Sequence, residues 1–213
     1  MAKNSIKPFR LEGFLRDIFK DVLNAIGGWL NKMGIKPNVI TITGLVGNIV
    51  AGGLIAFGQL TWGGIVAMIM GPLDAVDGTM ARLRDEPSAY GGFIDSVTDR
   101  YDELVLLAGL MIYFLQVQNW LGCLLVYFSA MGSVLVSYVR ARAETLGFTA
   151  KVGILTRVER YLILIPGLIF QMPLISLGIM AILANFTALQ RVFYVKKQAK
   201  SMVSQKKTEK MRK

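Results

Sequence analysis

Residues 73–99 read LDAVDGTMARLRDEPSAYGGFIDSVTD, and they place Asp74, Asp77, Asp95 and Asp99 in an otherwise apolar chain. Asp74 and Asp77 are three residues apart and Asp95 and Asp99 are four apart, so each pair lies on one face of its own helix. Ionisable side chains in such surroundings are costly and mark functional sites, because their charge needs a partner. Two helices lying side by side would bring the four carboxylates together. The stretch therefore predicts a cation site.

The chain around this stretch is too apolar for an ordinary soluble domain. Of its 213 residues 54% are hydrophobic and 18% charged, and the mean hydropathy is +0.50. No charged residue occurs in 37–73, 104–139 or 161–190. Because about 20 apolar residues span a membrane once, each neutral stretch accommodates a helix out and a helix back. The sequence predicts an all-α integral membrane protein with six transmembrane helices.

The basic residues lie on one side of the predicted hairpins. None of the 24 Lys and Arg residues falls in the expected turns at 58–61, 116–119 and 171–173. By the positive-inside rule, both termini and the site are then cytoplasmic in a multi-pass protein of the cell membrane. The net charge of +10 fits attraction to anionic lipid. We expect no nucleic-acid partner.

The two ends of the chain differ from its centre. Apolar residues recur at helical spacing in 9–31, which predicts an amphipathic helix on the cytoplasmic membrane surface. A soluble packing helix is the alternative. After Tyr194 the chain is basic and lacks apolar periodicity. We expect one membrane domain over 1–195 and a disordered cytoplasmic tail over 196–213.

Several other residues indicate structural roles. Arg140 and Glu144 are one helical turn apart and are expected to pair. Asp102 and Glu103 are expected in structural salt bridges or at the surface. Small residues would let a neighbouring helix approach the first span closely, and they are Gly44, Gly47, Ala51, Gly52 and Gly53.

The chain contains no histidine and a single cysteine, which limits its chemistry. Carboxylates are therefore the available metal ligands and general bases. They select hard cations such as Mg²⁺, Mn²⁺ or Ca²⁺, and four acids exceed what one ion requires. Two divalent ions held close together are typical of enzymes that displace a group at phosphorus, because they neutralise the transferred group and the leaving oxygen. A cation or proton transport path is the alternative use of buried acids.

The glycines and the arginine of the stretch complete a pattern with fixed gaps. It reads D-x-x-D-G-x-x-A-R, then eight residues, then G-x-x-x-D-x-x-x-D. Its members are Asp74, Asp77, Gly78, Ala81, Arg82, Gly91, Asp95 and Asp99. The pattern resembles the signature of the CDP-alcohol phosphotransferase family, as do the six-span layout and the amphipathic N-terminal helix. The resemblance implies a homodimeric enzyme in which an alcohol attacks the phosphorus of a CDP-activated lipid and CMP leaves.

The resemblance also implies roles for single residues. Asp74, Asp77 and Asp95 would bind two divalent ions, Mg²⁺ or Mn²⁺. Asp99 would bind one of them and act as the base toward the acceptor alcohol. The residues implied to bind the CDP-lipid are Pro37, Asn38, Thr41, Asp74, Gly78, Ala81, Arg82 and Gly91.

The acceptor depends on four arginines downstream of the pattern. They are Arg140, Arg157, Arg160 and Arg191, at the cytoplasmic ends of three predicted helices. Such guanidinium groups suit a phosphate, although they are also typical membrane anchors. These segments resemble family members that use inositol phosphate. We expect transfer of diacylglycerol phosphate from CDP-diacylglycerol to inositol phosphate, with glycerol phosphate as the alternative acceptor.

Overall fold

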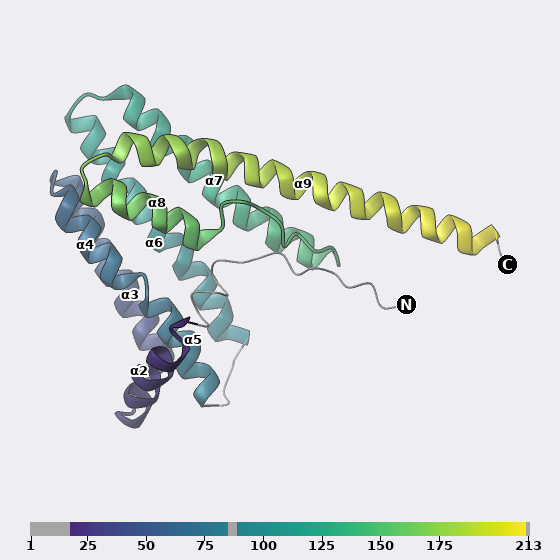
Figure 1. Cartoon of the computed structure of the whole chain (residues 1–213), viewed down its shortest axis with the longest axis horizontal. Coiled ribbons are helices and arrows are strands. Elements are labelled where there is room, and N and C mark those ends of the chain that lie inside the picture. Colours follow the sequence, from purple (N-terminus) through teal and green to yellow (C-terminus); the bar gives the residue numbers. More distant parts are fainter. Residues whose placement is uncertain (1–17, 85–88, 212–213) are drawn as a thin grey trace.

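The computed structural model describes residues 18–84 and 89–211, which form helices without a strand among them (Figure 1). The all-α class is therefore confirmed. In chain order the helices are α2 (Lys20–Lys32), α3 (Pro37–Ala56), α4 (Leu60–Met70), α5 (Leu73–Leu83), α6 (Ala89–Gln116), α7 (Trp120–Thr145), α8 (Arg157–Ile169) and α9 (Pro173–Met211).

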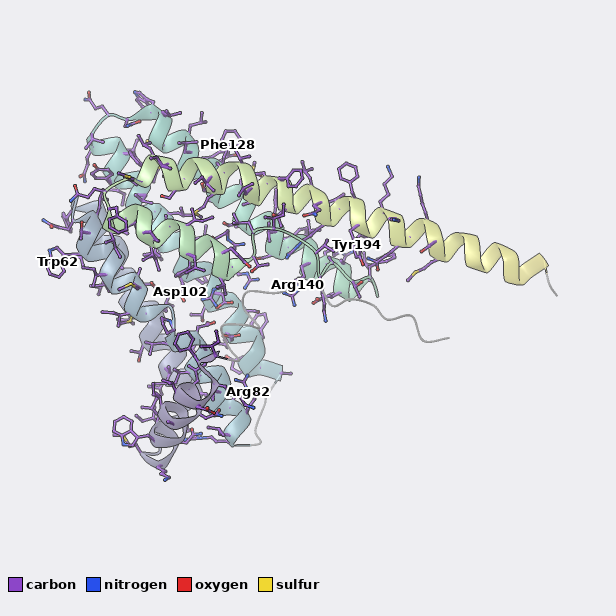
Figure 2. The ribbon with its side chains drawn as sticks, viewed as in Figure 1. Trp62, Arg82, Asp102, Phe128, Arg140 and Tyr194 are labelled. Atoms are coloured by element: carbon purple, nitrogen blue, oxygen red, sulfur yellow. The ribbon has the colours of Figure 1, made fainter. Side chains whose placement is uncertain are left out.

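Three helical hairpins turn where the sequence predicts. The turns after α3, α6 and α8 contain Gly58, Gln118 and Gln171, with φ of 79°, 54° and 56°. Trp62 and Trp120 are exposed just beyond the first two turns, as is typical of residues at a membrane–water interface. Figure 2 shows Trp62 at the left edge of the molecule and Arg140 near the middle of the view.

Within the described part of the chain, four helical segments are long and apolar enough to cross a membrane: Pro37–Ala56, Leu60–Leu83, Trp120–Thr145 and Pro173–Met202. The six predicted crossings are not confirmed on this criterion. Helix α6 is long, but it carries five charged residues between Asp95 and Glu103. Helix α8 has 13 residues. Its length of about 20 Å is therefore less than the thickness of the hydrocarbon core, which is about 30 Å.

Glycines let the helices that surround the site pack at backbone distance. A Cβ on Gly52 of α3 would lie 2.8 Å from the carbonyl oxygen of Val105 on α6. A Cβ on Gly132 of α7 would lie 2.8 Å from the Cβ of Ala184 on α9. The close approach predicted for the first span is confirmed at Gly52. Small side chains therefore bring α3 and α6 together.

Helix α2 is hydrogen-bonded to the C-terminal end of α5. The Asn31 side chain donates to the Met80 carbonyl oxygen at 3.1 Å and accepts from Arg84 Nε at 2.7 Å. Leu23 and Gly27 are buried, whereas several other apolar side chains of α2 are exposed. This pattern suits a helix lying at a membrane surface. Residues 9–17 of the predicted helix lie outside the described residues.

The C-terminal helix differs from the prediction. Helix α9 continues past Tyr194 to Met211 and projects beyond the other helices (Figure 1). The segment after residue 195 is thus helical where the sequence analysis expects disorder. Gln198 contributes to this extension, because it accepts from the Thr149 backbone N–H at 3.1 Å and donates to the Thr149 carbonyl oxygen at 2.5 Å.

Candidate active site

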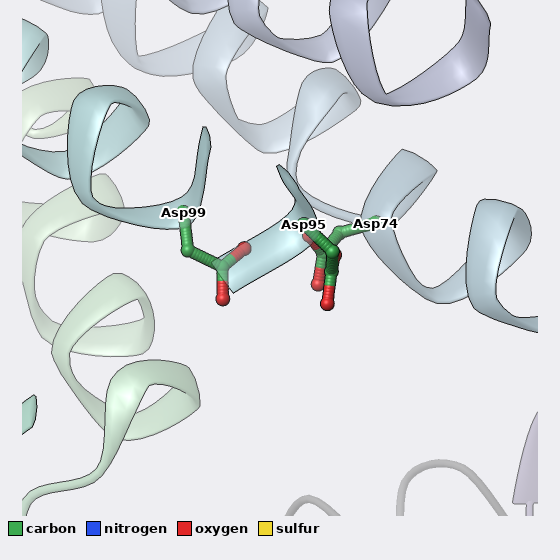
Figure 3. Close-up of side chains that lie close together, drawn as sticks. All are labelled: Asp74, Asp95 and Asp99. Carbon is green, nitrogen blue, oxygen red and sulfur yellow. The ribbon is translucent and has the colours of Figure 1, made fainter. Parts of the chain in front are cut away.

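Three of the four aspartates that the sequence predicts at one site converge. Helix α5 begins just after Pro72, which places Asp74 in its first turn, and α6 carries Asp95 and Asp99 on one face. Carboxylate oxygens of the three residues lie within 4.8 Å of one another (Figure 3). The N-terminal end of α5 favours the negative charge of Asp74, which lies in its first turn. The predicted convergence is confirmed for Asp74, Asp95 and Asp99.

The fourth aspartate, Asp77, lies one turn further along α5 and is buried. Thr41 of α3 donates its hydroxyl to Asp77 Oδ2 at 2.5 Å. Asp77 also lines a small cavity with Asp74, Thr98 and Asp102, between α3, α5 and α6. The predicted residue Thr41 therefore lies against the acidic cluster and orients one of its members.

Arg157 reaches the aspartates because of the way α8 begins. The Thr156 backbone N–H donates to the Glu159 carboxylate at 2.9 Å, as part of a capping box that starts the helix at Arg157. A cation in the first turn opposes the helix dipole, so it needs acidic partners. The local sequence thus places Arg157 at the N-terminal end of α8.

The aspartates supply those partners. Arg157 Nη1 donates to Asp74 Oδ2 at 2.5 Å and also forms an ion pair with Asp99. Its Nη2 lies 3.7 Å from Asp102 Oδ2. The arginine therefore bridges α5 and α6 from α8, and it joins the acidic cluster on the side of Asp99.

Negative charge exceeds positive charge at this site. Asp74, Asp95, Asp99 and Asp102 face Arg157, while Arg100 adds a 3.5 Å contact to Asp99. Like charges this close repel one another unless a cation lies between them. An oxygen-only donor set suits Mg²⁺ or Mn²⁺, and the residues present therefore fit a divalent cation.

The other predicted CDP-lipid residues lie at the starts of α3 and α6 and along α5. A Cβ on Gly78 would lie 3.6 Å from Arg82 Nη1, so the glycine leaves the space beside this guanidinium open. Arg82 Nη2 also donates to Thr79 Oγ1 at 2.7 Å. Pro37 is the first residue of α3, Asn38 beside it is exposed, and Ala81 and Gly91 are partly buried.

The four predicted acceptor arginines have separate partners among the described contacts. Arg160 is buried and forms a two-pronged ion pair with Glu103 of α6. Arg191 is buried and donates to the carbonyl oxygens of Val152 and Val136 at 2.8 and 2.5 Å. Arg140 is exposed and pairs with Glu144 at 3.1 Å, as predicted. Of these described contacts, those of Arg157 reach the aspartates Asp74 and Asp99.

Two features of the site were not identified from the sequence. The threonine and glutamate of T-x-x-E at 156–159 form the capping box that sets the start of α8, and their spacing before an apolar run was available as a signal. The pairing of Arg157 with Asp99 had no local signal, because it joins helices distant in the chain. For Glu103 a structural salt bridge was one of the two expected roles, and this is confirmed.

Comparisons with known proteins agree with this arrangement. The sequence pattern of the CDP-alcohol phosphatidyltransferase family matches residues 35–194. An archaetidylinositol phosphate synthase of Pyrococcus horikoshii is 34% identical over 185 residues, covering 86% of this chain and 96% of that protein. A phosphatidylinositol phosphate synthase of Streptomyces avermitilis is 30% identical, covering 93% of this chain and 87% of its own.

The fold is also similar to solved structures. The crystal structure of Mycobacterium tuberculosis phosphatidylinositol phosphate synthase with manganese and citrate gives a TM-score of 0.76 at 25% identity, covering 81% of this chain and 88% of that one. The same enzyme with CDP-DAG bound gives 0.76 at 24% identity. On the family match and the extent of identity to its relatives, this chain belongs to the CDP-alcohol phosphatidyltransferase family.

Proposed function

We propose that this chain transfers a diacylglycerol phosphate group from CDP-diacylglycerol to inositol phosphate, forming phosphatidylinositol phosphate and releasing CMP. The convergence of Asp74, Asp95 and Asp99 beside Arg157 carries the proposal, because it joins a divalent-cation site to a phosphate-binding group. The names of the relatives support inositol phosphate as the acceptor. The bound CDP-DAG of the M. tuberculosis enzyme supports the donor.

The acidic residues would hold two divalent cations, Mg²⁺ or Mn²⁺. Asp74, Asp77 and Asp95 are the proposed ligands, and Asp99 would be a ligand to one ion. When bound, the cations neutralise the diphosphate of the donor and the charge that develops on the leaving CMP. Thr41 keeps the Asp77 carboxylate oriented through its 2.5 Å hydrogen bond. The manganese complex of the M. tuberculosis enzyme is consistent with this assignment.

Asp99 is the proposed general base. An acceptor hydroxyl positioned beside Asp99 gives up its proton to the carboxylate as its oxygen attacks the phosphorus that carries diacylglycerol. A new P–O bond forms to the acceptor, and the P–O bond to CMP breaks. The side chain of Asp99 is 14% exposed, so the base lies within reach of a soluble substrate but largely away from bulk water.

The CDP-lipid would lie along α5 and the start of α3. Gly78 leaves space for the nucleotide, and the adjacent Arg82 guanidinium offers hydrogen bonds to the diphosphate. Pro37, Asn38 and Thr41 would border the nucleotide from α3. Ala81 on α5 and Gly91 on α6 add little or no side-chain bulk of their own.

The acceptor phosphate would lie between Arg157 and the arginines of neighbouring helices. Arg157 has the strongest support, because it reaches the aspartates directly. Arg191 on α9 holds the loop before α8 through Val152, and Arg140 lies near the end of α7. We place Arg140 and Arg191 at the edge of this phosphate site. Arg160 is buried against Glu103, and a different role for it is argued below.

We further propose that six helices cross the cell membrane, with both termini and the site on the cytoplasmic side. Helix α6 would cross despite its charges, because Glu103 is neutralised by Arg160 and the aspartates lie at the cytoplasmic end. Helix α8 would complete the third hairpin with α9. Residues 1–195 would form the membrane domain, and the protein would be a homodimer, as the family resemblance implies.

An acceptor panel tests the proposal. The purified chain is supplied with CDP-diacylglycerol and Mg²⁺, and CMP release is measured with inositol phosphate, free inositol, glycerol phosphate or serine. We expect release to depend on inositol phosphate. Release with glycerol phosphate instead would establish the alternative acceptor. A protein that releases no CMP but conducts cations or protons across liposomes would contradict the enzyme.

A further inference from the structure

Helices α6 and α8 are joined by two arginine–carboxylate pairs in the same order along both helices. Asp99 pairs with Arg157, and one turn deeper Glu103 pairs with Arg160. The two acids are four residues apart on α6 and the two arginines three apart on α8, so the acids share one face of α6 and the arginines share one face of α8. The deeper pair therefore lies about 5 Å further along the helices than the pair at the active site.

The deeper pair is almost completely enclosed, and each of its charged-group nitrogen and oxygen atoms takes part in a hydrogen bond. Its side chains are 3% and 5% exposed for Arg160 and Glu103. Arg160 Nε donates to Glu103 Oε1 at 2.6 Å, and Nη2 donates to Oε2 at 2.8 Å. Ser133 of α7 donates to the same Oε1 at 2.7 Å, and Arg160 Nη1 donates to the Leu155 carbonyl oxygen at 3.4 Å. The network thus joins α6, α7, α8 and the loop that leads into α8.

Such a network defines geometry more than it adds stability. A buried ion pair is often no more stable than well-packed apolar residues, whereas its two-pronged geometry permits one alignment of the helices. Arg157 lies one turn before Arg160 on the same helix, so its position depends on the rotation and depth of α8. A slip of about 1 Å in such a group can cost about 100-fold in rate.

We propose that Glu103 is a positioning residue that, by holding Arg160, sets the rotation and depth of α8 and keeps Arg157 against Asp74 and Asp99. Arg160 is then a structural partner of Glu103, and Arg157 is the arginine offered to the acceptor phosphate. The inference rests on the proposed function, in which Arg157 binds that phosphate. It assigns a role to Glu103 and Ser133, which lie outside the eight-residue family pattern.

The test compares the two substrates in the purified full-length chain. We expect Glu103→Gln to raise the KM for inositol phosphate about tenfold, with the KM for CDP-diacylglycerol changed less than about twofold. If Arg160 were itself a phosphate ligand held back by Glu103, this variant would lower the KM for inositol phosphate. A lowered KM, or an equal rise for both substrates, would overturn the proposal.

A double variant separates positioning from stability. Glu103→Leu/Arg160→Met removes both charges together, so the unfolding temperature should stay close to that of the wild type. The KM for inositol phosphate should nevertheless remain about tenfold raised. A wild-type KM for inositol phosphate in this variant would show that the pair serves stability alone.

A matched pair of serines keeps the test decisive if the double variant does not fold. Ser133 donates to Glu103, and Ser129, one turn away on α7, donates to the Leu177 carbonyl oxygen of α9. Ser133→Ala should raise the KM for inositol phosphate about threefold, and Ser129→Ala should not. An equal KM for inositol phosphate in the two serine variants would overturn the inference but not the proposed function. A wild-type chain that releases no CMP would overturn both.

Discussion

The two ends of the α6–α8 contact use the same kinds of side chain with opposite charge balance. At the inner end one arginine meets one glutamate, and both are almost completely enclosed. At the outer end Arg157 meets Asp74, Asp99 and Asp102, with Asp95 beside them. There the side chains of Arg157 and Asp74 are 23% and 32% exposed.

This difference in charge balance distinguishes the charges that stabilise the fold from those that bind a ligand. The inner pair is neutral, and both carboxylate oxygens and all three guanidinium nitrogens take part in hydrogen bonds, so it needs no ligand to balance its charge. The outer group keeps more negative than positive charge, and this surplus is resolved when a cation binds. The inner side chains are also the more enclosed, but burial by itself does not call for a ligand. A surplus of charge does.

Removal of divalent cations should have the largest effect, because it acts on the outer group alone. We expect a chelator to abolish CMP release and added Mg²⁺ or Mn²⁺ to restore it. Cation binding should also raise the unfolding temperature, since it relieves repulsion among Asp74, Asp95 and Asp99. Full turnover in the presence of chelator would show that the outer group does not need a cation, and would contradict the distinction drawn between it and the Arg160–Glu103 pair.

Asp95→Asn should be next in magnitude. It removes one charge of the outer group without changing its shape, and loss of several kcal/mol of transition-state stabilisation corresponds to about 10³-fold in kcat. The readouts are the steady-state rate and the Mn²⁺-induced shift in unfolding temperature. Asp21→Asn on the exposed face of α2 is the matched control and should retain wild-type values for both.

Replacing the two arginines of α8 should separate stability from function. Arg160→Ala leaves Glu103 buried without its partner, which should lower the free energy of unfolding by about 3–5 kcal/mol. With Mg²⁺ saturating, Arg157→Ala should change it by less than about 1 kcal/mol but raise the KM for inositol phosphate at least about tenfold. Thermal unfolding and steady-state kinetics on both variants measure these effects. A large loss of stability in Arg157→Ala, with a raised KM but normal stability in Arg160→Ala, would contradict the roles given to the two ends.

The smallest effect is expected at the exposed pair of α7. Arg140 and Glu144 have side chains 45% and 44% exposed, so water screens their attraction. Glu144→Gln should change the free energy of unfolding by less than about 0.5 kcal/mol. A loss comparable to that of Arg160→Ala in the same thermal unfolding assay would mean that burial does not decide the strength of these pairs.

Local pattern predicted much of the fold and of the acidic site. Turn residues such as Gly58 and Gln171 lie where neutral stretches fold back, and Asp95 and Asp99 share a face because helical spacing requires it. The partner of each arginine was not predictable, because it depends on which helices meet. Arg160 was expected to bind a phosphate, whereas in the structure its guanidinium group pairs with the carboxylate of Glu103. The length of α9 was missed because its extension lacks apolar periodicity.

The most direct test of the account measures kcat for CMP release at saturating inositol phosphate in two variants that each neutralise one acid of α6. Asp99→Asn removes the proposed base at the outer end and should lose about 10³-fold in kcat while still binding the CDP-lipid. Glu103→Gln alters the inner end and should recover a kcat within about twofold of the wild type once the acceptor saturates. Wild-type turnover by Asp99→Asn would contradict the account.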